Sequence, residues 1–547
     1  MKKRDIHKLY ATTFDLLVIG GGVHGATITC HAAKAGYHTA LVEKNDFCGA
    51  TSANSLKILH GGLRYLQHGN IKRMRHSIIA RREMMQMAPY LVEPLPCIMP
   101  LCGRGLRGPV AMRTALFLND CIGWDRNHGL PAALHLPKGH IVSTQKCREV
   151  IPGIATEALH GGAVWYDALA VNTERLVLEY ILESCDYGAE AANYAQVTAV
   201  EKGDDGLYEV TILDRLSKQV HRMKTRCIVN AAGPWFEEIL QPPGPGQEKK
   251  QQWALALNIV SRKKIFHEYA VALEGKSRYE DRDALIQRGR RLYFFVPWQG
   301  YTMIGTEYEA SDAGPDSLRV SRETLQNMVD EVNAIYPPAQ LNYEDLSFYH
   351  AGLLPMRSEA ESDDIQLTKN STFFVNHGDK CNRIVSVKGV KYTTAPWIAR
   401  EITAYLKKHC QPSRLGGVPK KFPKNIEPRD GENSALYTSL AKKYGKRAMK
   451  ILSLLQQPDD IRRDKASQLL RAEVRYLVTE EMACTLADII FRRTALGSAE
   501  CPQRDVLVQT AAFMGEILGW DEARRESEID EVLLRYSPLV VPASRNE

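Results

Sequence analysis

Three glycines at fixed spacing follow a short apolar run near the N-terminus. Residues 14–28 read FDLLVIGGGVHGATI and contain G-x-G-x-x-G at Gly20, Gly22 and Gly25. The first glycine permits a tight turn, the second lets the backbone approach a pyrophosphate, and the third lets a helix pack closely on a strand. The N–H groups of the following helix, expected from about Gly25 to Ala35, would point at that pyrophosphate. These residues leave NAD, FAD or a ligand-free turn open.

The flanking segments favour a dinucleotide over a bare turn. Residues 16–19 are continuously apolar, as in a strand buried on both faces of a parallel sheet. A second strand, HTALVEK, ends at Glu43, about 20 residues after the glycines, where a carboxylate can bind ribose hydroxyls. Lys44, the next residue, is a further candidate for cofactor binding.

The composition excludes several classes of protein. The chain has 547 residues, of which 44% are apolar, so we expect two or three domains with substantial cores. No apolar run is long enough to span a membrane, and we interpret the basic, then apolar N-terminus as folded protein rather than a signal peptide. The net charge of +7 is too diffuse to indicate nucleic-acid binding. The twelve cysteines contain no C-x-x-C pair, so we expect reduced thiols, no metal site and a cytoplasmic protein.

The rest of the chain is divided by pattern. Strand-like alternation fills residues 190–233, a helix is expected near 321–335, and RIVSVKGVKYTTAPWIAREITAYLKK indicates strand, turn and helix. Residues 411–433 are rich in proline and glycine and predict a linker, after which the pattern is helical. Residues 104–118, RGLRGPVAMRTALFL, combine Arg104, Arg107 and Arg113 with an apolar helix. This segment suits either an amphipathic helix on a membrane surface or an ordinary solvated helix.

Several motifs occur in an order that identifies a family resemblance. VIGGGVHGA, ATSANSLKILHGGLRYL, VNAAGPW, VKGVKYTT and, in the tail, EVRYLV and FRRTALG resemble the FAD-dependent glycerol-3-phosphate dehydrogenases within the D-amino-acid-oxidase-like flavoproteins. The resemblance covers nearly the whole chain and favours FAD over NAD. It implies a fold of the α+β/α/β class, with a Rossmann-like FAD-binding domain, a mixed β-sheet substrate domain and a helical C-terminal domain at 434–547. The FAD-binding parts are expected at about 14–100, 160–240 and 350–410, and the substrate parts at about 101–159 and 241–349.

The resemblance also implies residue roles. Lys391 would stabilise charge on the reduced flavin, and Arg64 and Tyr65 would lie near the substrate. The residues expected at the cofactor are Gly20, Gly22, Gly25, Glu43, Lys44, Thr51, Ser52, Gly61, Gly62, Val197, Ala232, Gly233, Gly389, Lys391, Tyr392 and Thr393.

Departures from the family pattern cluster on the substrate side. An arginine in the family's YSGVRPL becomes Leu354, with Arg357 three residues further on. The family's histidine in GSHIVV aligns with Asn258, and asparagine cannot act as a general base near neutral pH. His350, beside the altered position, is a candidate for a relocated base. The family's GTTD becomes GTEY at 305–308, GGK becomes GVK at 389–391, and an arginine becomes Lys369.

Three functions therefore stay open. The first is an FAD-dependent dehydrogenase of a small hydroxylated anion, glycerol 3-phosphate or a related phosphopolyol, which passes electrons to a quinone. The second is a divergent flavin oxidase or dehydrogenase acting on an amine, amino acid or hydroxy acid. The third is a flavin-binding protein without catalysis. We expect a peripheral position on the inner face of the cytoplasmic membrane through residues 104–118, and the sequence leaves a homo-oligomer open.

Overall fold

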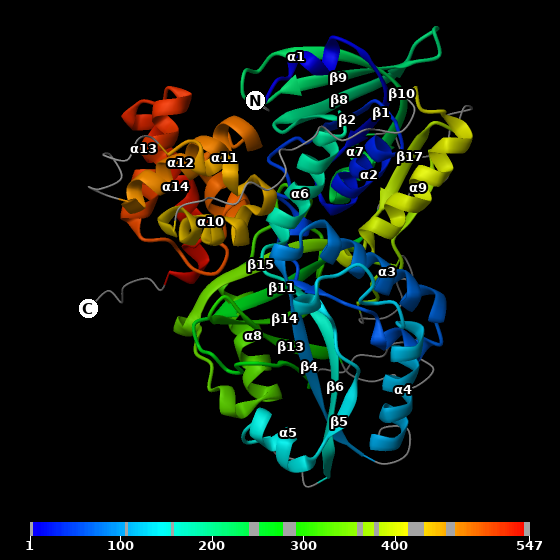
Figure 1. Ribbon diagram of the computed structural model, residues 1–547, viewed down its shortest axis with the longest axis vertical. Coiled ribbons are helices and arrows are strands. Elements are labelled where there is room, and N and C mark those ends of the chain that lie inside the picture. The colour runs from blue at the N-terminus through cyan, green and yellow to red at the C-terminus, as the bar shows by residue number, and fades with distance from the viewer. Residues whose placement is uncertain are drawn as a thin grey trace.

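The computed structural model describes nine stretches of the chain. They form two large β-sheets and a group of C-terminal helices (Figure 1). Arg104 and Arg107 of the predicted membrane-surface segment, and residues 414–430 of the predicted linker, lie outside the described residues. Within the described part, no helix combines the length and hydropathy needed to cross a bilayer. The described stretches are 4–103, 108–154, 158–239, 251–276, 291–357, 365–376, 382–413, 431–455 and 465–540.

The first sheet has eight strands and carries the glycine turn. Strand β1 (Thr13–Ile19) pairs in parallel with β2 (Thr39–Val42) on one side and with β10 (Val220–Asn230) on the other. All of β1 except Thr13 is buried, as expected for a parallel strand covered on both faces. The order is β16–β17–β10–β1–β2–β7, and the β8–β9 hairpin joins at β10. The other strands are β7 (Glu190–Ala192), β8 (Ala195–Lys202), β9 (Tyr208–Asp214), β16 (Thr372–Val375) and β17 (Ile384–Lys388).

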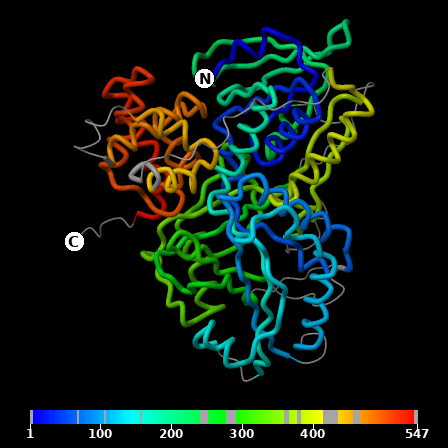
Figure 2. Tube along the Cα trace, viewed as in Figure 1, coloured from blue at the N-terminus to red at the C-terminus, as the bar shows by residue number. Residues whose placement is uncertain are grey.

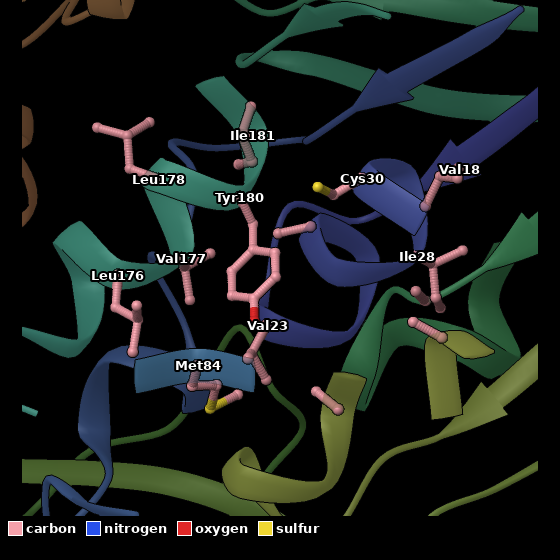
Figure 3. Close-up of a cluster of buried hydrophobic side chains, with 14 of the residues drawn as sticks. Val18, Val23, Ile28, Cys30, Met84, Leu176, Val177, Leu178, Tyr180 and Ile181 are labelled. Atoms are coloured by element: carbon pink, nitrogen blue, oxygen red, sulfur yellow. The ribbon is translucent and has the colours of Figure 1, made fainter. Parts of the chain in front are cut away.

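Buried helices hold this sheet in place. Helices α2 (Val23–Lys34), α3 (Ile71–Met87), α6 (Thr173–Asp186) and α9 (Ala395–His409) share one core with it, and almost every residue of α6 is buried. Figure 3 shows part of this core, where Tyr180 of α6 lies among side chains from the neighbouring elements. Burying aromatic and aliphatic side chains contributes roughly 1.5–3 kcal/mol each, so this core fixes the glycine turn firmly.

The second sheet has nine strands in the order β15–β11–β14–β13–β12–β4–β6–β3, with β5 paired to β6. It is mixed, because β12 and β4 run parallel while its other neighbouring strands run antiparallel. The strands are β3 (Ile58–Leu59), β4 (Val92–Cys102), β5 (His140–Val142), β6 (Leu159–Ala170), β11 (Trp253–Ser261), β12 (Ala270–Glu274), β13 (Leu292–Trp298), β14 (Tyr301–Ser311) and β15 (Leu346–Pro355). The remaining helices of this half and of the N-terminal region are α1 (His7–Tyr10), α4 (Pro109–Ile122), α5 (Thr144–Val150), α7 (Phe236–Ile239) and α8 (Arg322–Ile335).

The borders between the two sheets differ from the expected ones. Strand β6 and nearly all of β4 were expected in the FAD-binding parts, and β15 was expected to straddle the border at 350. All three belong to the nine-stranded sheet. The chain passes between the sheets several times, and the local pattern of a strand does not reveal which strands its backbone pairs with.

The C-terminal region is helical, as predicted. It contains α10 (Gly431–Tyr444), α11 (Ala448–Leu452), α12 (Lys465–Glu481), α13 (Arg504–Leu518), α14 (Glu522–Leu534) and a single π-helical turn, η12 (Asp488–Arg493). Figure 2 shows these orange and red segments beside both sheets. Arg175 of α6 makes a buried two-pronged ion pair with Glu481 of α12, with the Nη2–Oε1 distance 2.6 Å. The helical region is therefore fastened to the FAD-binding half through charged groups that are removed from water.

Candidate functional site

A cavity of about 770 Å³ lies between the two sheets. One end is formed by the glycine turn and the end of β2, and the other by His60, residues 62–65 and residues 389–394 together with strands β11, β14 and β15. Each end has its own chemistry, since the first is built from glycines with Glu43 and Lys44, and the second gathers the cations Arg64, Arg73 and Lys391.

The glycine turn has the geometry that a dinucleotide requires. Gly20 has φ +104°, and a Cβ there would lie 2.6 Å from the carbonyl oxygen of Ala231. A Cβ on Gly25 would overlap the carbonyl oxygen of Gly20. Gly22, the N-cap of α2, supplies no side-chain cap, and Gly22 and Val23 line the cavity, so the N-terminus of this helix faces the cavity with its positive dipole end.

Glu43 joins the end of β2 to this turn. Its carboxylate accepts hydrogen bonds from the backbone N–H groups of Gly21 at 2.7 Å and Asn45 at 2.9 Å. Burial raises the pKa of Glu43, although both hydrogen bonds lower it. Beside it, Lys44 lies 3.9 Å from the ring centroid of Trp235 and 2.9 Å from Asp316. A half-buried carboxylate at this point suits ribose hydroxyls.

Most of the predicted cofactor residues lie on the cavity wall. The structure brings Gly20, Gly22, Glu43, Lys44, Thr51, Ser52, Gly62, Val197, Ala232, Gly233, Gly389, Lys391, Tyr392 and Thr393 together around the cavity. Gly25 and Gly61 lie just behind it, where Gly25 sets the helix–strand distance and the N–H of Gly61 donates to Asp167 at 2.6 Å.

Two further contacts shape the middle of the wall. The Ser52 hydroxyl accepts from the N–H of Val23 at 3.0 Å, and the Thr51 hydroxyl donates to the carbonyl of Leu353 at 3.1 Å. Both residues belong to the 3-10 turn η1 (Thr51–Asn54), which packs on β15. This turn therefore links the glycine turn to the floor of the second sheet.

The surroundings of His24 bear on whether the cavity suits a flavin dinucleotide. His24 is half-buried on the cavity wall, and its Nε2, which is buried, has no hydrogen-bond partner among the described residues. Burial lowers the pKa of His24 to about 4, so the ring is neutral. A Cβ on Gly389 would lie 2.6 Å from this ring. Gly389 therefore lets residues 389–394 approach α2 closely, and the cavity left beside Gly20 and Gly22 is the space that a bound FAD would fill.

The cationic end contains the predicted residues Arg64, Tyr65 and Lys391. The Lys391 ammonium donates to the Tyr65 hydroxyl at 2.9 Å, and the Arg73 guanidinium lies 4.3 Å from the Tyr65 ring centroid. Burial raises the pKa of Tyr65, but Lys391 and Arg73 outweigh it and bring the pKa down to about 8. Arg64 is exposed at the cavity and makes no hydrogen bond or ion pair with any described residue.

The altered residues Asn258 and Leu354 line the cavity floor. The Asn258 amide donates to the carbonyl of Asn54 at 3.1 Å, and its oxygen accepts from Thr306 at 2.8 Å. This side chain is therefore held in place and has no capacity to take up a proton. Leu354 contributes only an apolar surface, and Arg357 is not on the wall.

His350 does not reach the cavity. It lies opposite Asn258 in the strand register, but its ring is buried and its Nε2 is 3.0 Å from the carbonyl oxygen of Ser498. Two aromatic rings also pack near it, with centroids 5.0 Å away at Phe348 and 6.0 Å away at Trp298. Burial, together with Lys57, lowers the pKa of His350 well below its usual value. The structure thus separates His350 from the other predicted residues.

A histidine–aspartate pair on the wall was not among the predicted catalytic residues. His60 is 44% exposed, and its Nδ1 lies 3.1 Å from Asp167 of β6. Burial raises the pKa of Asp167, but His60 and Arg81 hold it at about 2, so Asp167 is a carboxylate at neutral pH. The backbone N–H of His60 donates to Thr393 at 3.3 Å, which places the pair at the cationic end. The sequence feature that could have pointed to this pair is Asp167, a carboxylate inside the otherwise apolar strand segment WYDALA.

Comparison with known proteins agrees with this geometry. A family model described as FAD dependent oxidoreductase matches residues 15–405, and one described as C-terminal domain of alpha-glycerophosphate oxidase matches residues 408–525. The glycerol-3-phosphate dehydrogenase of Synechocystis sp. is 28% identical over 518 residues, which are 90% of each chain. That of Mycobacterium leprae is 27% identical over 550 residues, covering 96% of this chain and 88% of the relative.

A solved structure shows the same fold. The glycerol-3-phosphate dehydrogenase from Bacillus halodurans complexed with FAD superposes with a TM-score of 0.73 at 22% sequence identity, covering 99% of this chain and 98% of the other. The two-sheet architecture with its appended helices is therefore shared over the full length.

Proposed function

Because the chain belongs to the FAD-dependent oxidoreductases, we propose that it is a dehydrogenase of a small hydroxylated anion, glycerol 3-phosphate or a related phosphopolyol. When bound, FAD would supply the two-electron oxidant, with N5 as the hydride acceptor, and a quinone would be the next electron acceptor. The observation that carries the proposal is the Arg64 guanidinium, which lines the cavity at the end that holds His60 and Lys391 and has no hydrogen-bond or ion-pair partner among the residues that the structure describes.

The protein residues have separate tasks in this proposal. Arg64 binds the substrate anion, because a guanidinium matches phosphate through paired hydrogen bonds. His60 accepts the hydroxyl proton, and Asp167 orients the imidazole through Nδ1 and stabilises its charged form. Asn258 is held rigidly enough to orient a hydroxyl group, and Lys391 keeps a positive charge at the cavity wall.

Substituting Arg64 by methionine tests the substrate anchor. A charge-assisted hydrogen bond contributes about 1.5–3 kcal/mol, so KM for glycerol 3-phosphate should rise about 10- to 100-fold. Glycerol, which lacks the phosphate, should be oxidised equally poorly by both proteins. The measurement is steady-state oxidation with a dye as electron acceptor.

Arg148→Met on α5 is the matched control, because Arg148 is exposed and does not line the cavity.

The same assay on amino acids and hydroxy acids addresses the second candidate function. That alternative is favoured by one observation, the apolar surface of Leu354 where the family has an arginine. If kcat/KM is higher for these compounds than for any phosphopolyol, then amino acids or hydroxy acids are the substrate class in place of the proposed one.

We extend the proposal to the membrane surface through α4. On one side of this helix, Met112 and Ala115 line the cavity. On the surface, Val110, Phe117 and Leu118 are 78%, 66% and 45% exposed, and Trp124 just beyond the helix is 79% exposed. An apolar surface flanked by the exposed Arg113 suits the interfacial region of an anionic membrane. Contact there would bring a lipid-dissolved quinone to the cavity wall.

Phe117→Glu should weaken binding to vesicles of anionic phospholipid about 10- to 100-fold, since burying a phenylalanine contributes about 1.5–3 kcal/mol. Co-sedimentation at low salt is the measurement. Leu534→Glu on α14 is the control, because Leu534 is 70% exposed but lies in the C-terminal region. Equal binding of the wild type and Phe117→Glu would exclude α4 as the membrane surface.

A further inference from the structure

Two chain segments form the wall of the cavity near Glu43. The first follows β2 and contributes Glu43, Lys44 and Asn45, and the second begins β8 and contributes residues 195–198. They are joined by backbone hydrogen bonds, because the N–H of Ala195 donates to the carbonyl of Glu43 at 2.8 Å. This end of the cavity would hold the adenosine half of FAD, and we call the space between these two segments the adenosine slot.

The residue after the first segment, Asp46, is buried and does not line the cavity. Its carboxylate accepts four hydrogen bonds. Arg493 donates two, at 2.6 and 2.7 Å, Arg492 donates one at 2.5 Å, and Asn193 donates one at 2.8 Å. Both arginines belong to the π-helical turn η12, more than 440 residues away in the sequence. The first segment is therefore held from behind by the C-terminal region.

The second segment is held by the same region. The hydroxyl of Tyr194 donates to Asp488 at 2.7 Å, and Arg492 bridges to this carboxylate at 2.5 Å. The amide of Asn193 also donates to the carbonyl of Met482 at 2.8 Å. The turn η12 thus contacts both segments that form the adenosine slot. A π-helical turn is an uncommon element that often occurs at functional positions.

The C-terminal region acts on this slot only indirectly. None of its described residues, 431–455 and 465–540, lines the cavity. The side chains of Asp46 and Arg493 are each 1% exposed, so the positions of these charges are fixed by one another rather than by water. The separation of η12 from the first sheet therefore sets the position of the loop that carries Glu43.

We propose that the C-terminal helical region retains FAD by holding the adenosine slot in shape, with Arg492 and Arg493 as positioning residues that act through Asp46 and Asp488. This role concerns cofactor affinity and does not depend on which substrate the enzyme oxidises. It gives the appended helices a task in the first sheet that lies outside the reaction itself.

The test compares FAD with FMN, which lacks the adenosine half. The full-length chain is stripped of cofactor and titrated with each flavin, with protein fluorescence as the readout. Asp46→Asn should weaken FAD binding about 3- to 30-fold, the usual range for coupling through a network, and leave FMN binding unchanged. A merely structural defect would weaken the binding of both flavins alike.

Glu481→Gln is the matched control, because it breaks the buried Arg175–Glu481 ion pair across the same interface, and neither residue lines the cavity. It should lower stability but keep the ratio of FAD to FMN affinity. Arg493→Lys retains the charge without the two-pronged fork and should shift that ratio in the same direction as Asp46→Asn, which covers the case in which Asp46→Asn fails to fold. Unchanged ratios in both Asp46→Asn and Arg493→Lys, or an equal shift in Glu481→Gln, would overturn the proposal.

Discussion

Valine in place of Gly25 should remove FAD from the protein. A Cβ at this position would overlap the carbonyl oxygen of Gly20, so α2 must move away from β1 and the N–H groups at its start must leave the cavity wall. Overpacking of this kind costs about 1–3 kcal/mol, and misplacing the pyrophosphate site adds to it. We therefore expect FAD to bind at least about 100-fold more weakly, equivalent to ~3 kcal/mol.

Flavin absorbance per chain after purification and titration of added FAD give the measurement, and circular dichroism shows whether the variant folds. Gly515→Ala on α13 is the control, because the nearest atoms to its Cβ would belong to the side chain of Arg525, which can move, and to the side chain of Trp520 at an ordinary distance. A Gly25→Val protein that purifies with one tightly bound FAD would show that this turn is not the pyrophosphate site.

His60→Gln should leave FAD bound but slow flavin reduction about 10²- to 10⁴-fold, the usual contribution of a general base. Glutamine retains a polar group near Asp167 but cannot take the hydroxyl proton. Asp167→Asn should produce a smaller defect, because the imidazole remains while its orienting carboxylate is lost. Anaerobic stopped-flow mixing measures the rate, and binding of a non-reacting phosphate analogue shows that the cavity is intact.

His140→Gln on β5 is the control for these two variants, since His140 is exposed and is not on the cavity wall. If His60→Gln reduces its flavin at the wild-type rate, the proton acceptor is another group. Tyr65 would then be the first alternative, because its pKa of about 8 gives a rate that rises as the pH increases through 8.

The dinucleotide end of the cavity could be predicted because its signals are local. The glycine spacing lies within six residues, and the apolar strand, the helix and Glu43 follow in order along the chain. Each of these features is determined by residues that are close together in the sequence, through turn sterics, burial on both faces of a strand and the helix dipole. The helical C-terminal region was predicted from its local pattern in the same way, whereas the FAD-binding fold was expected from the family resemblance, and both are confirmed.

The substrate end could not be predicted as fully because its contacts join distant segments. His350 sits beside Asn258 in the strand register, yet its ring packs against the C-terminal region, and nothing in FYHAGLLPM indicates that. The partnership of His60 with Asp167 spans 107 residues, and that of Asp46 with Arg493 spans 447. Such pairs depend on how the two sheets and the helices are assembled, which local periodicity does not encode.

The most direct measurement is anaerobic mixing of the FAD-loaded protein with glycerol 3-phosphate while the flavin absorption band is followed. We expect the band to bleach in a single turnover, and to remain when glycerol without the phosphate is used at the same concentration. A colourless protein that takes up no added FAD, or a flavin band that stays unchanged with every phosphopolyol, would contradict an FAD enzyme that recognises its substrate through Arg64.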